Sequence, residues 1–258
     1  MRSRLTVALG RTARLAARVR GGGSGGTAFP GLVMERTDPG FLERTLSRLP
    51  RGVIVVSGTN GKTTTTKMVV QLLREQGLKV FTNRTGSNFV RGVLASLLTE
   101  VDAAGNLDAD IAVLELDEAH AVHFVARVRP RACLLLNVMR DQLDRFGEID
   151  YTASLLHSIA QATSDVVVLN GDDPRLAAPA FLEGVSARVV SFGAGEDLRS
   201  LFLSDDDLRT GMVSPRQGDQ APSPRVTLEA IDGQRATVRV DGTSHEVDFA
   251  IPGVHNLL

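Results

Sequence analysis

A glycine-rich turn between an apolar run and a helical pattern carries the residue types that bind phosphate. The run Val53 to Val56 is aliphatic and β-branched, which is typical of a strand buried on both faces. Gly58 and Gly61 follow it and allow a tight turn whose N–H groups approach an anion. From Lys62 the apolar spacing becomes helical, and the pattern ends at Gly77. A strand, a glycine-rich turn and a helix N-terminus predict a phosphate cradle, because the helix dipole and the first free amides favour negative charge.

Two side chains at the start of this helix indicate the chemistry of the cradle. Lys62 can reach the outer phosphates of a nucleotide, and the hydroxyl of Thr63 can ligate magnesium. The turn G-T-N-G-K-T is shorter than the usual G-x-x-x-x-G-K-[ST] spacing, since Val56 occupies the position of its first glycine. The alternative is an ordinary strand-to-helix turn, but the strand, the helix and the Gly-Lys-Thr core together favour a nucleotide site. The residues expected to contact the nucleotide are Gly58, Thr59, Asn60, Gly61, Lys62, Thr63 and Thr64.

The rest of the chain predicts an α/β fold of the P-loop type, with a parallel sheet and helices on both faces. Apolar runs alternate with helical patterns, and ligands of such sheets lie beyond the carboxyl ends of the strands. Further strands are expected at 78–82, 111–116, 132–138, 165–169 and 188–192, and helices at 89–98, 118–128, 151–162 and 174–182. After residue 193 the sequence predicts a mobile loop over 194–224 and a small antiparallel β meander over 225–251.

Polar residues follow the expected strands, where a parallel sheet would bring them to one edge. They are residues 83–88, Glu115 with Asp117 and Glu118, residues 137–145, and residues 170–174. Carboxylates opposite a phosphate loop suit a magnesium ion, which takes few protein ligands. Asp172-Asp173-Pro174 can equally be a helix start with proline at the first position.

A zinc site is a weaker alternative. His120 and His123 lie three residues apart on an expected helix, close to Glu118. No further ligand follows at metal spacing, so these histidines are better explained as lining a site or as packing.

The first 20 residues contain six arginines and no acidic residue. On a helical wheel Arg4, Arg11, Arg14 and Arg18 share one side, and an apolar side consists of Leu5, Leu9, Ala16 and Val19. Such a helix either rests on an anionic membrane surface or packs on the domain by its apolar side. A glycine-rich joint over 21–26 separates this segment, residues 1–27, from a nucleotide-binding domain expected over 28–258.

Composition excludes several classes of protein. With 29 Lys and Arg against 30 Asp and Glu, the chain lacks the basic excess of a general nucleic-acid binder. Its single cysteine, Cys133, lies in an apolar run and is expected to be a buried thiol, so a disulfide or a cysteine zinc site is not expected. No apolar stretch approaches the roughly 18 residues of a membrane span, and we expect a cytoplasmic protein.

The motifs together resemble the Mur ligase superfamily of ATP-dependent ligases. They are Gly58 to Thr64, Leu114 to Asp117, Asn137 to Arg145, Asn170 to Asp173 and Gly253 to Asn256. Within it, the segments 82–88, 117–124 and 140–150 are similar to the MurT subfamily.

The resemblance implies a reaction in cell-wall synthesis. MurT activates the α-carboxylate of D-glutamate in lipid II as an acyl phosphate, which ammonia from a GatD-like glutaminase partner converts to an amide. By the same resemblance ATP and Mg2+ are cofactors, with Lys62, Glu115 and Asp141 catalytic and with Thr63 and Glu115 holding magnesium. It also assigns Asn170, His255 and Asn256 to the nucleotide, and Asn83, Thr85, Ser87, Asn88 and His120 to the substrate.

Departures from the superfamily pattern bear on the reaction. Gln142 stands where peptide ligases carry a histidine, and no lysine follows Lys79 to be carbamoylated, which favours MurT over an amino-acid-adding Mur or folylpolyglutamate-type ligase. The four-cysteine zinc ribbon of many MurT proteins is absent, so no zinc is expected. The terminal motif stops two residues after Asn256, which predicts that the C-terminal ligase domain is missing and that the fragment alone is inactive. A nucleotide switch is disfavoured, because no Asn-Lys pair of a guanine-binding motif occurs.

Overall fold

The computed structural model describes residues 2–19, 28–83, 87–140, 148–204, 207–208, 211 and 224–248. The chain divides into two compact units. The first comprises Met1–Ser57 with Thr65–Ala132, and the second comprises Gly58–Thr64 with Cys133–Leu258. The expected phosphate loop therefore belongs to the second unit, although the strand before it and most of the helix after it belong to the first.

Three parallel strands form the centre of the first unit, in the order β2-β3-β1. They are β1 (Val53–Ser57), β2 (Val80–Thr82) and β3 (Ile111–Glu115). Every residue of β3 is buried, as expected for a middle strand with both faces covered. In the register of β1 and β3, Val56 lies opposite Glu115. Glu115 is the last residue of β3, so it lies at the carboxyl end of the strand.

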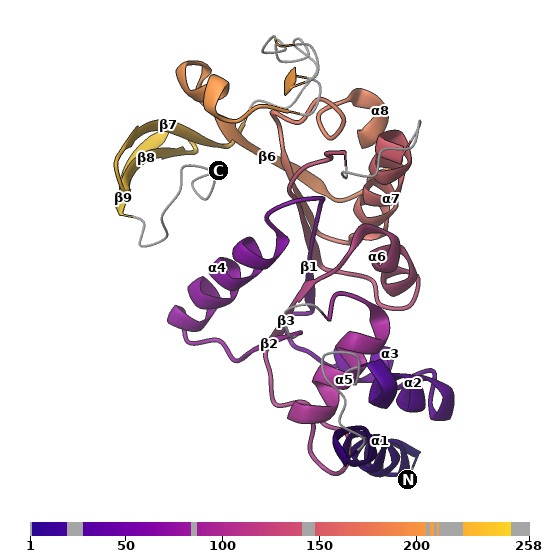
Figure 1. Cartoon of the computed structure of the whole chain (residues 1–258). Helices are drawn as coiled ribbons and strands as arrows, with labels where there is room; N and C mark the ends of the chain where they lie inside the picture. The colour runs from indigo at the N-terminus through magenta and orange to yellow at the C-terminus, as the bar shows by residue number, and fades with distance from the viewer. Residues whose placement is uncertain are drawn as a thin grey trace. The chain divides into compact units, whose positions relative to one another are not determined.

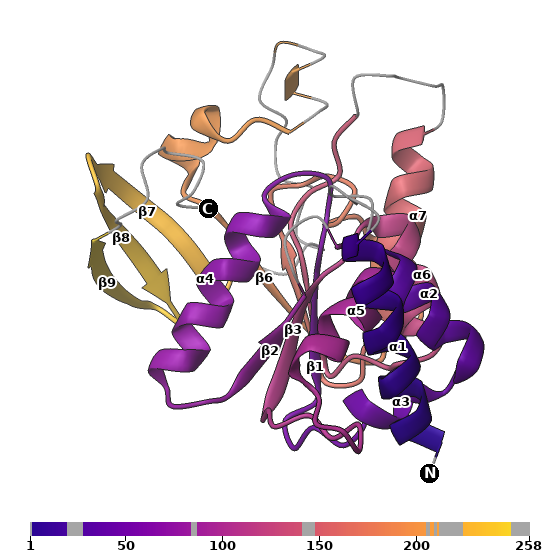
Figure 2. The same ribbon diagram turned by 60° about the horizontal axis from the view of Figure 1, so that its bottom comes forward.

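Helices cover both faces of these strands, as the sequence predicts (Figure 2). α4 lies on one face and α5 on the other, where α2 packs on α5 and α1 packs on α2. The helices are α1 (Arg2–Val19), α2 (Ala28–Thr37), α3 (Phe41–Leu46), α4 (Lys62–Glu75), α5 (Val90–Glu100) and α6 (Glu118–Val125).

The second unit combines parallel strands with an antiparallel end, in the order β4-β5-β6-β7-β8-β9. Figure 1 shows β7, β8 and β9 side by side. β5, β6 and β7 are parallel, whereas β7, β8 and β9 form the predicted meander with turns at Gly233 and Gly242. The strands are β4 (Ala132–Leu135), β5 (Val166–Asn170), β6 (Arg188–Ala194), β7 (Val226–Asp232), β8 (Arg235–Val240) and β9 (Thr243–Asp248). Its helices are α7 (Glu148–Ala162), α8 (Pro179–Leu182) and the 3-10 helix η2 (Glu196–Leu201). The α/β class, with a mixed sheet that is parallel at its core, is confirmed.

Local interactions account for the boundaries that the sequence places wrongly. The helix expected over 174–182 is only α8, because Ala178 before Pro179 is extended, with ψ 137°. Residues 196–201, expected in a loop, form η2. Arg199 of η2 is buried and pairs with Glu196 and Asp172. α2 is not predicted, since Pro30 and Gly31 lower the helix propensity of its segment. The six-residue α3 is not predicted either.

α1 packs on the first unit, but not through the side that the sequence suggests. Its buried residues are Thr6, Val7, Gly10 and Ala13. The apolar side with Leu5, Leu9, Ala16 and Val19 is exposed, so the expectation that this side packs on the domain is wrong. Among the described residues, no helix is long and apolar enough to cross a membrane.

Candidate nucleotide site

The loop between β1 and α4 has a backbone shape that requires glycine. Gly58 has φ +135° and Gly61 has φ +83°, a region that residues with a side chain rarely adopt. A Cβ at Gly58 would lie 3.0 Å from the amide nitrogen of Asn137 and 3.1 Å from the Cβ of Leu136. The loop therefore turns sharply and packs tightly against the chain that follows β4.

Asn137 fastens this loop through its backbone and its side chain. Its carbonyl oxygen accepts from the amide of Thr59 at 3.0 Å, and its Oδ1 accepts from the amide of Asn60 at 2.9 Å. Its Nδ2 donates to the carbonyl of Asn60 at 3.1 Å. The amide of Met139 adds a bond to the Oγ1 of Thr59 at 3.0 Å. Since Thr59 and Asn60 direct their amides to Asn137, the amides from Gly61 onward are the better candidates for contact with an anion.

Sequence reasoning places Asn137 and Met139 in a motif but gives them no individual role. The strand expected over 132–138 ends at Leu135, and the next residues turn toward the loop instead of extending the sheet. The sequence feature that could have identified Asn137 is its position at the end of an expected strand, because ligand-binding residues of a parallel sheet follow the carboxyl ends of its strands.

Lys62 lies over the loop that it follows. Its ammonium group donates to the carbonyl of Thr59 at 2.9 Å and to the carbonyl of Gly58. Lys62 and Thr63 are the first residues of α4, where the helix dipole favours an anion. A positive side chain, a helix N-terminus and a glycine-shaped turn thus meet within seven consecutive residues, Gly58–Thr64.

Asp173 supports the segment that holds the loop. It is buried, and its Oδ2 accepts from the amide of Val138 at 2.7 Å. Its Oδ1 accepts from the amides of Arg175 at 2.9 Å and Leu176 at 3.1 Å, which makes it the organiser of a turn after β5. This geometry favours the structural interpretation of Asp173 over a magnesium ligand. Asn170 ends β5, and its Oδ1 accepts from the amide of Asp172 at 2.9 Å.

The first unit brings three of the predicted substrate residues, Asn83, Ser87 and Asn88, to the carboxyl ends of β2 and β3. Asn83 is buried; its Nδ2 donates to the carbonyls of Ser87 at 2.9 Å and Glu115 at 2.8 Å, and its Oδ1 accepts from the amide of Glu115. Asn83 therefore links the ends of the two strands through hydrogen bonds. Its predicted contact with substrate remains a prediction. Asn88 accepts the amide of Asp117 through its carbonyl, so the start of α6 is joined to the same edge.

The two predicted metal ligands lie in different units. Glu115 is buried at the end of β3 in the first unit, and Thr63 belongs to the loop of the second. The zinc alternative receives no support, because no group of three or more His, Cys, Asp or Glu residues within the described ranges could hold a metal. His120 is exposed with its ring 5.9 Å from that of Phe89, and His123 is also exposed.

Several assigned residues fall outside the part of the chain that the structure describes. They are Thr85, Asp141, His255 and Asn256. Cys133 is buried as predicted, and burial raises the pKa of its thiol to about 12, as expected for an inert core side chain.

Replacing Asn137 with alanine should loosen the phosphate loop without unfolding the second unit. Two side-chain hydrogen bonds to Asn60 disappear, whereas the bond from Thr59 to the backbone oxygen remains. At about 1 kcal/mol for each bond, we expect nucleotide affinity to fall about ten- to thirtyfold. Calorimetric titration with ATP and magnesium measures this. Asn106→Ala is the control, since that side chain bonds Asp102; equal losses in both variants would contradict the anchoring role.

Asp173 should give the fold a distinctive pH dependence. Burial raises the pKa of its carboxyl above the ordinary value of 3.8, against the opposing effect of the bonds from Val138, Leu176 and Arg175. The folded state then holds this proton more tightly than the unfolded state, so stability should fall as pH rises from the ordinary pKa through the raised one. Urea unfolding across this range should show a flatter dependence for Asp173→Asn. Identical slopes for the two proteins would contradict the assignment.

Comparison with known proteins places the chain in a class. The model of the Mur ligase middle domain matches residues 56–258, and the chain belongs to the Mur ligase family. Among curated relatives, it is 37% identical over 150 residues to subunit MurT of the glutamine-hydrolysing lipid II isoglutaminyl synthase of Streptococcus pneumoniae, covering 58% of this chain and 33% of that protein. It is also 33% identical over 156 residues to the UDP-N-acetylmuramoylalanine–D-glutamate ligase of Desulfotalea psychrophila, covering 60% of this chain and 29% of that protein. The chain thus spans about a third of the length of these relatives.

Solved structures show the same fold at lower identity. MurF from Acinetobacter baumannii is 20% identical with a TM-score of 0.63, and the match covers 88% of this chain and 44% of that one. MurF from Thermotoga maritima, solved in complex with ADP, is 20% identical with a TM-score of 0.59, covering 82% and 44%.

Proposed function

We propose that the complete protein is an ATP-dependent carbon–nitrogen ligase whose nucleotide-binding region is this chain. The observation that carries the proposal is the Gly58–Thr64 loop, with its positive-φ glycines, the ammonium of Lys62 against it and a helix N-terminus behind it. Membership of the Mur ligase family supports it, as does the ADP bound to the Thermotoga maritima MurF of the same fold.

The residues fit the demands of phosphoryl transfer, which depends mainly on positioning and on neutralising charge. When bound, ATP would supply the phosphoryl group that turns a carboxylate into an acyl phosphate, with ADP as the other product. Lys62 and the amides from Gly61 onward would neutralise the outer phosphates, and Asn137 would keep the loop in place. Within the loop, the hydroxyl of Thr63 is our candidate for a magnesium ligand. A nitrogen nucleophile then attacks the acyl carbon, and inorganic phosphate leaves.

For the substrates, we propose the α-carboxylate of D-glutamate in lipid II and ammonia from a GatD-like glutaminase subunit. The 37% identity to a MurT subunit supports this choice, together with Gln142 and the lack of any lysine after Lys79. The edge built by Asn83, Ser87 and Asn88 is our candidate for substrate contact, with His120 beside it. Because ATP is the phosphoryl donor, we place the reaction in the cytoplasm.

Reconstitution of the complete protein with its glutaminase subunit tests the proposal. Lipid II, ATP, magnesium and glutamine should give amidated lipid II, detected by mass spectrometry together with ADP and phosphate. Ammonium salts should replace glutamine and the glutaminase. Failure to amidate lipid II from either nitrogen source, in a protein that binds ATP, would exclude this reaction.

An amino-acid-adding ligase is the second candidate. The 33% identity to a UDP-N-acetylmuramoylalanine–D-glutamate ligase favours it. Incubation with uridine nucleotide–linked muramoyl peptides and free amino acids distinguishes the two: ATP-dependent addition of an amino acid would replace the amidation proposal.

A further inference from the structure

α1 carries its large aliphatic side chains on the outside of the first unit. Leu5, Leu9, Leu15 and Val19 are 59%, 39%, 63% and 81% exposed. With 3.6 residues per turn, Leu5 and Leu9 stack at a spacing of four, as do Leu15 and Val19, and all four fall within one side of the helix. This apolar stripe, Leu5/Leu9/Leu15/Val19, is the reverse of the usual pattern, in which a packed helix turns its aliphatic side chains inward.

Small residues hold α1 on the domain and fix which side faces outward. Gly10 lies so close to its neighbours that a Cβ there would be 3.0 Å from side-chain atoms of both Leu98 and Met34. Thr6 and Ala13, on the same side as Gly10, are buried too. Together with the buried Val7, these residues face the domain, and at Gly10 there is no space for a leucine between Leu98 and Met34.

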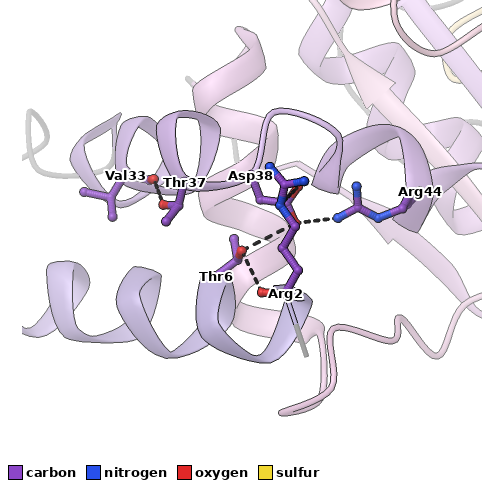
Figure 3. A network of polar contacts seen from close by, with 6 residues as sticks. All are labelled: Arg2, Thr6, Val33, Thr37, Asp38 and Arg44. Carbon is purple, nitrogen blue, oxygen red and sulfur yellow. Dashed lines mark hydrogen bonds and ion pairs between the residues drawn. The ribbon is translucent and has the colours of Figure 1, made fainter.

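A buried carboxylate fixes the N-terminal end of α1 (Figure 3). Asp38, whose side chain is fully buried, pairs with the guanidinium of Arg44 and, at 3.5 Å, with the Nε of Arg2 on α1. The hydroxyl of Thr6 lies 3.4 Å from the same carboxylate. Further along, Nη2 of Arg11 donates to the carbonyl of Val101 at 3.0 Å. Rotating α1 to bury the apolar stripe would break these bonds, so the exposed stripe is built into the fold.

The charge beside the stripe identifies the kind of surface it fits. Residues 2–19 contain five arginines and no acidic residue, although the whole chain has a net charge of −1. Arg4 and Arg11 are exposed. Asp38, which pairs with Arg2 of α1, is buried and also pairs with Arg44. An apolar stripe on a helix with arginines and no acidic residue complements a surface that offers both hydrocarbon and anionic groups.

We propose that α1 lies on the surface of a bilayer that contains anionic lipids, with the apolar stripe at the boundary between headgroups and acyl chains. The arginines beside the stripe then meet lipid phosphates, while Thr6, Gly10 and Ala13 keep the helix on the protein. Membrane contact would not depend on the reaction proposed above, because α1 carries none of the residues assigned to it.

Vesicle binding by the complete protein tests the proposal. We expect it to bind vesicles of equimolar phosphatidylglycerol and phosphatidylcholine, with affinity falling as salt rises, and to bind pure phosphatidylcholine much more weakly. Exchanging Leu5, Leu9 and Leu15 for glutamine should weaken binding about a hundredfold. The control exchanges Leu72, Leu201 and Leu208, which are 63%, 46% and 60% exposed elsewhere in the chain, and it should bind like the wild type.

Two double variants that remove the same charge test how the arginines of α1 contribute to vesicle binding. Arg4→Gln with Arg11→Gln should weaken binding to the anionic vesicles about tenfold or more, at about 1 kcal/mol for each arginine near the surface. Lys67→Gln with Arg74→Gln removes the same charge from α4 and should have little effect. If both double variants lost the same vesicle affinity, the loss would come from the net charge of the protein, and membrane binding could not be assigned to α1.

A tryptophan placed in the stripe reports its surroundings directly. Residues 1–258 contain no tryptophan, so Leu15→Trp adds an emission that can be taken as the difference from the wild-type protein. It should shift to shorter wavelength with anionic vesicles, whereas Leu72→Trp, at an equally exposed position, should not. An unshifted Leu15→Trp spectrum would overturn the proposal. The proposal would also be overturned if the leucine variant bound vesicles like the wild type. Loss of a protein partner or of self-association in that variant would then assign the stripe to a protein contact.

Discussion

Lys62→Ala is expected to lower ATP turnover by the complete protein about a hundred- to thousandfold, the range found when one charge-stabilising donor is removed from an active site. The ammonium of Lys62 already lies against the loop, within 2.9 Å of the carbonyl of Thr59, where it would meet the phosphates. Its loss removes the only positive side chain of the Gly58–Thr64 loop. The fold should be retained, because the ammonium of Lys62 donates to carbonyls of the short loop itself.

Lys67→Ala is the matched control, since it removes a lysine from the exposed side of the same helix. Thermal unfolding of both variants should stay close to that of the wild type, which separates lost chemistry from lost structure. Turnover of ATP in the presence of the acceptor substrate is the measurement. If Lys62→Ala kept wild-type turnover, or if Lys67→Ala lost as much, Lys62 would have no special role with the nucleotide.

The sequence predicts the β1–loop–α4 unit well because its signals are local. The aliphatic strand, the glycines and the helix start are consecutive, so the identity of each residue reports its own backbone state. The alternation of strands and helices likewise gives the α/β class and the meander of β7, β8 and β9. None of this required knowledge of which strands are neighbours.

Contacts between distant segments are what the sequence does not reveal. Asn60 and Asn137 are 77 residues apart, and Asn83 and Glu115 are 32 apart. The residue types alone do not indicate that Asn137 holds the loop. They also do not indicate that the side-chain amide of Asn83 forms hydrogen bonds with the backbone of Ser87 and Glu115. Both require the three-dimensional path of the chain, in which a side chain after one strand meets the end of another.

The orientation of α1 is a second case in which residue types mislead. A helical wheel shows an apolar side and an arginine side, and hydrophobicity alone would bury the first. The structure instead buries Thr6, Val7, Gly10 and Ala13, where Gly10 allows close approach and the buried Asp38 meets Thr6 and Arg2. These contacts between distant segments cannot be read from a helical wheel.

Gly58→Ala should severely disrupt the nucleotide site. The added Cβ meets the nitrogen and oxygen of Asn137 at 3.0 and 3.1 Å and the Cβ of Leu136 at 3.1 Å, and backbone atoms cannot rotate away as the end of a long side chain can. It also forces alanine to φ +135°. Strain and overlap together should cost about 2–5 kcal/mol, and the displaced loop should bind ATP at least about a hundredfold more weakly.

Gly77→Ala separates the two causes of this loss. Gly77 also has a positive φ, +81°, but a Cβ there meets nothing within 4 Å, so only the backbone cost of about 1–2 kcal/mol applies. It should leave ATP affinity unchanged, because it lies at the far end of α4 from the loop. Calorimetric titration gives the affinity and urea unfolding gives the stability of each variant. Since the loop depends on its close packing with residues 136–137, equal stability losses in the two variants, or wild-type affinity in Gly58→Ala, would show that this packing does not shape the nucleotide site.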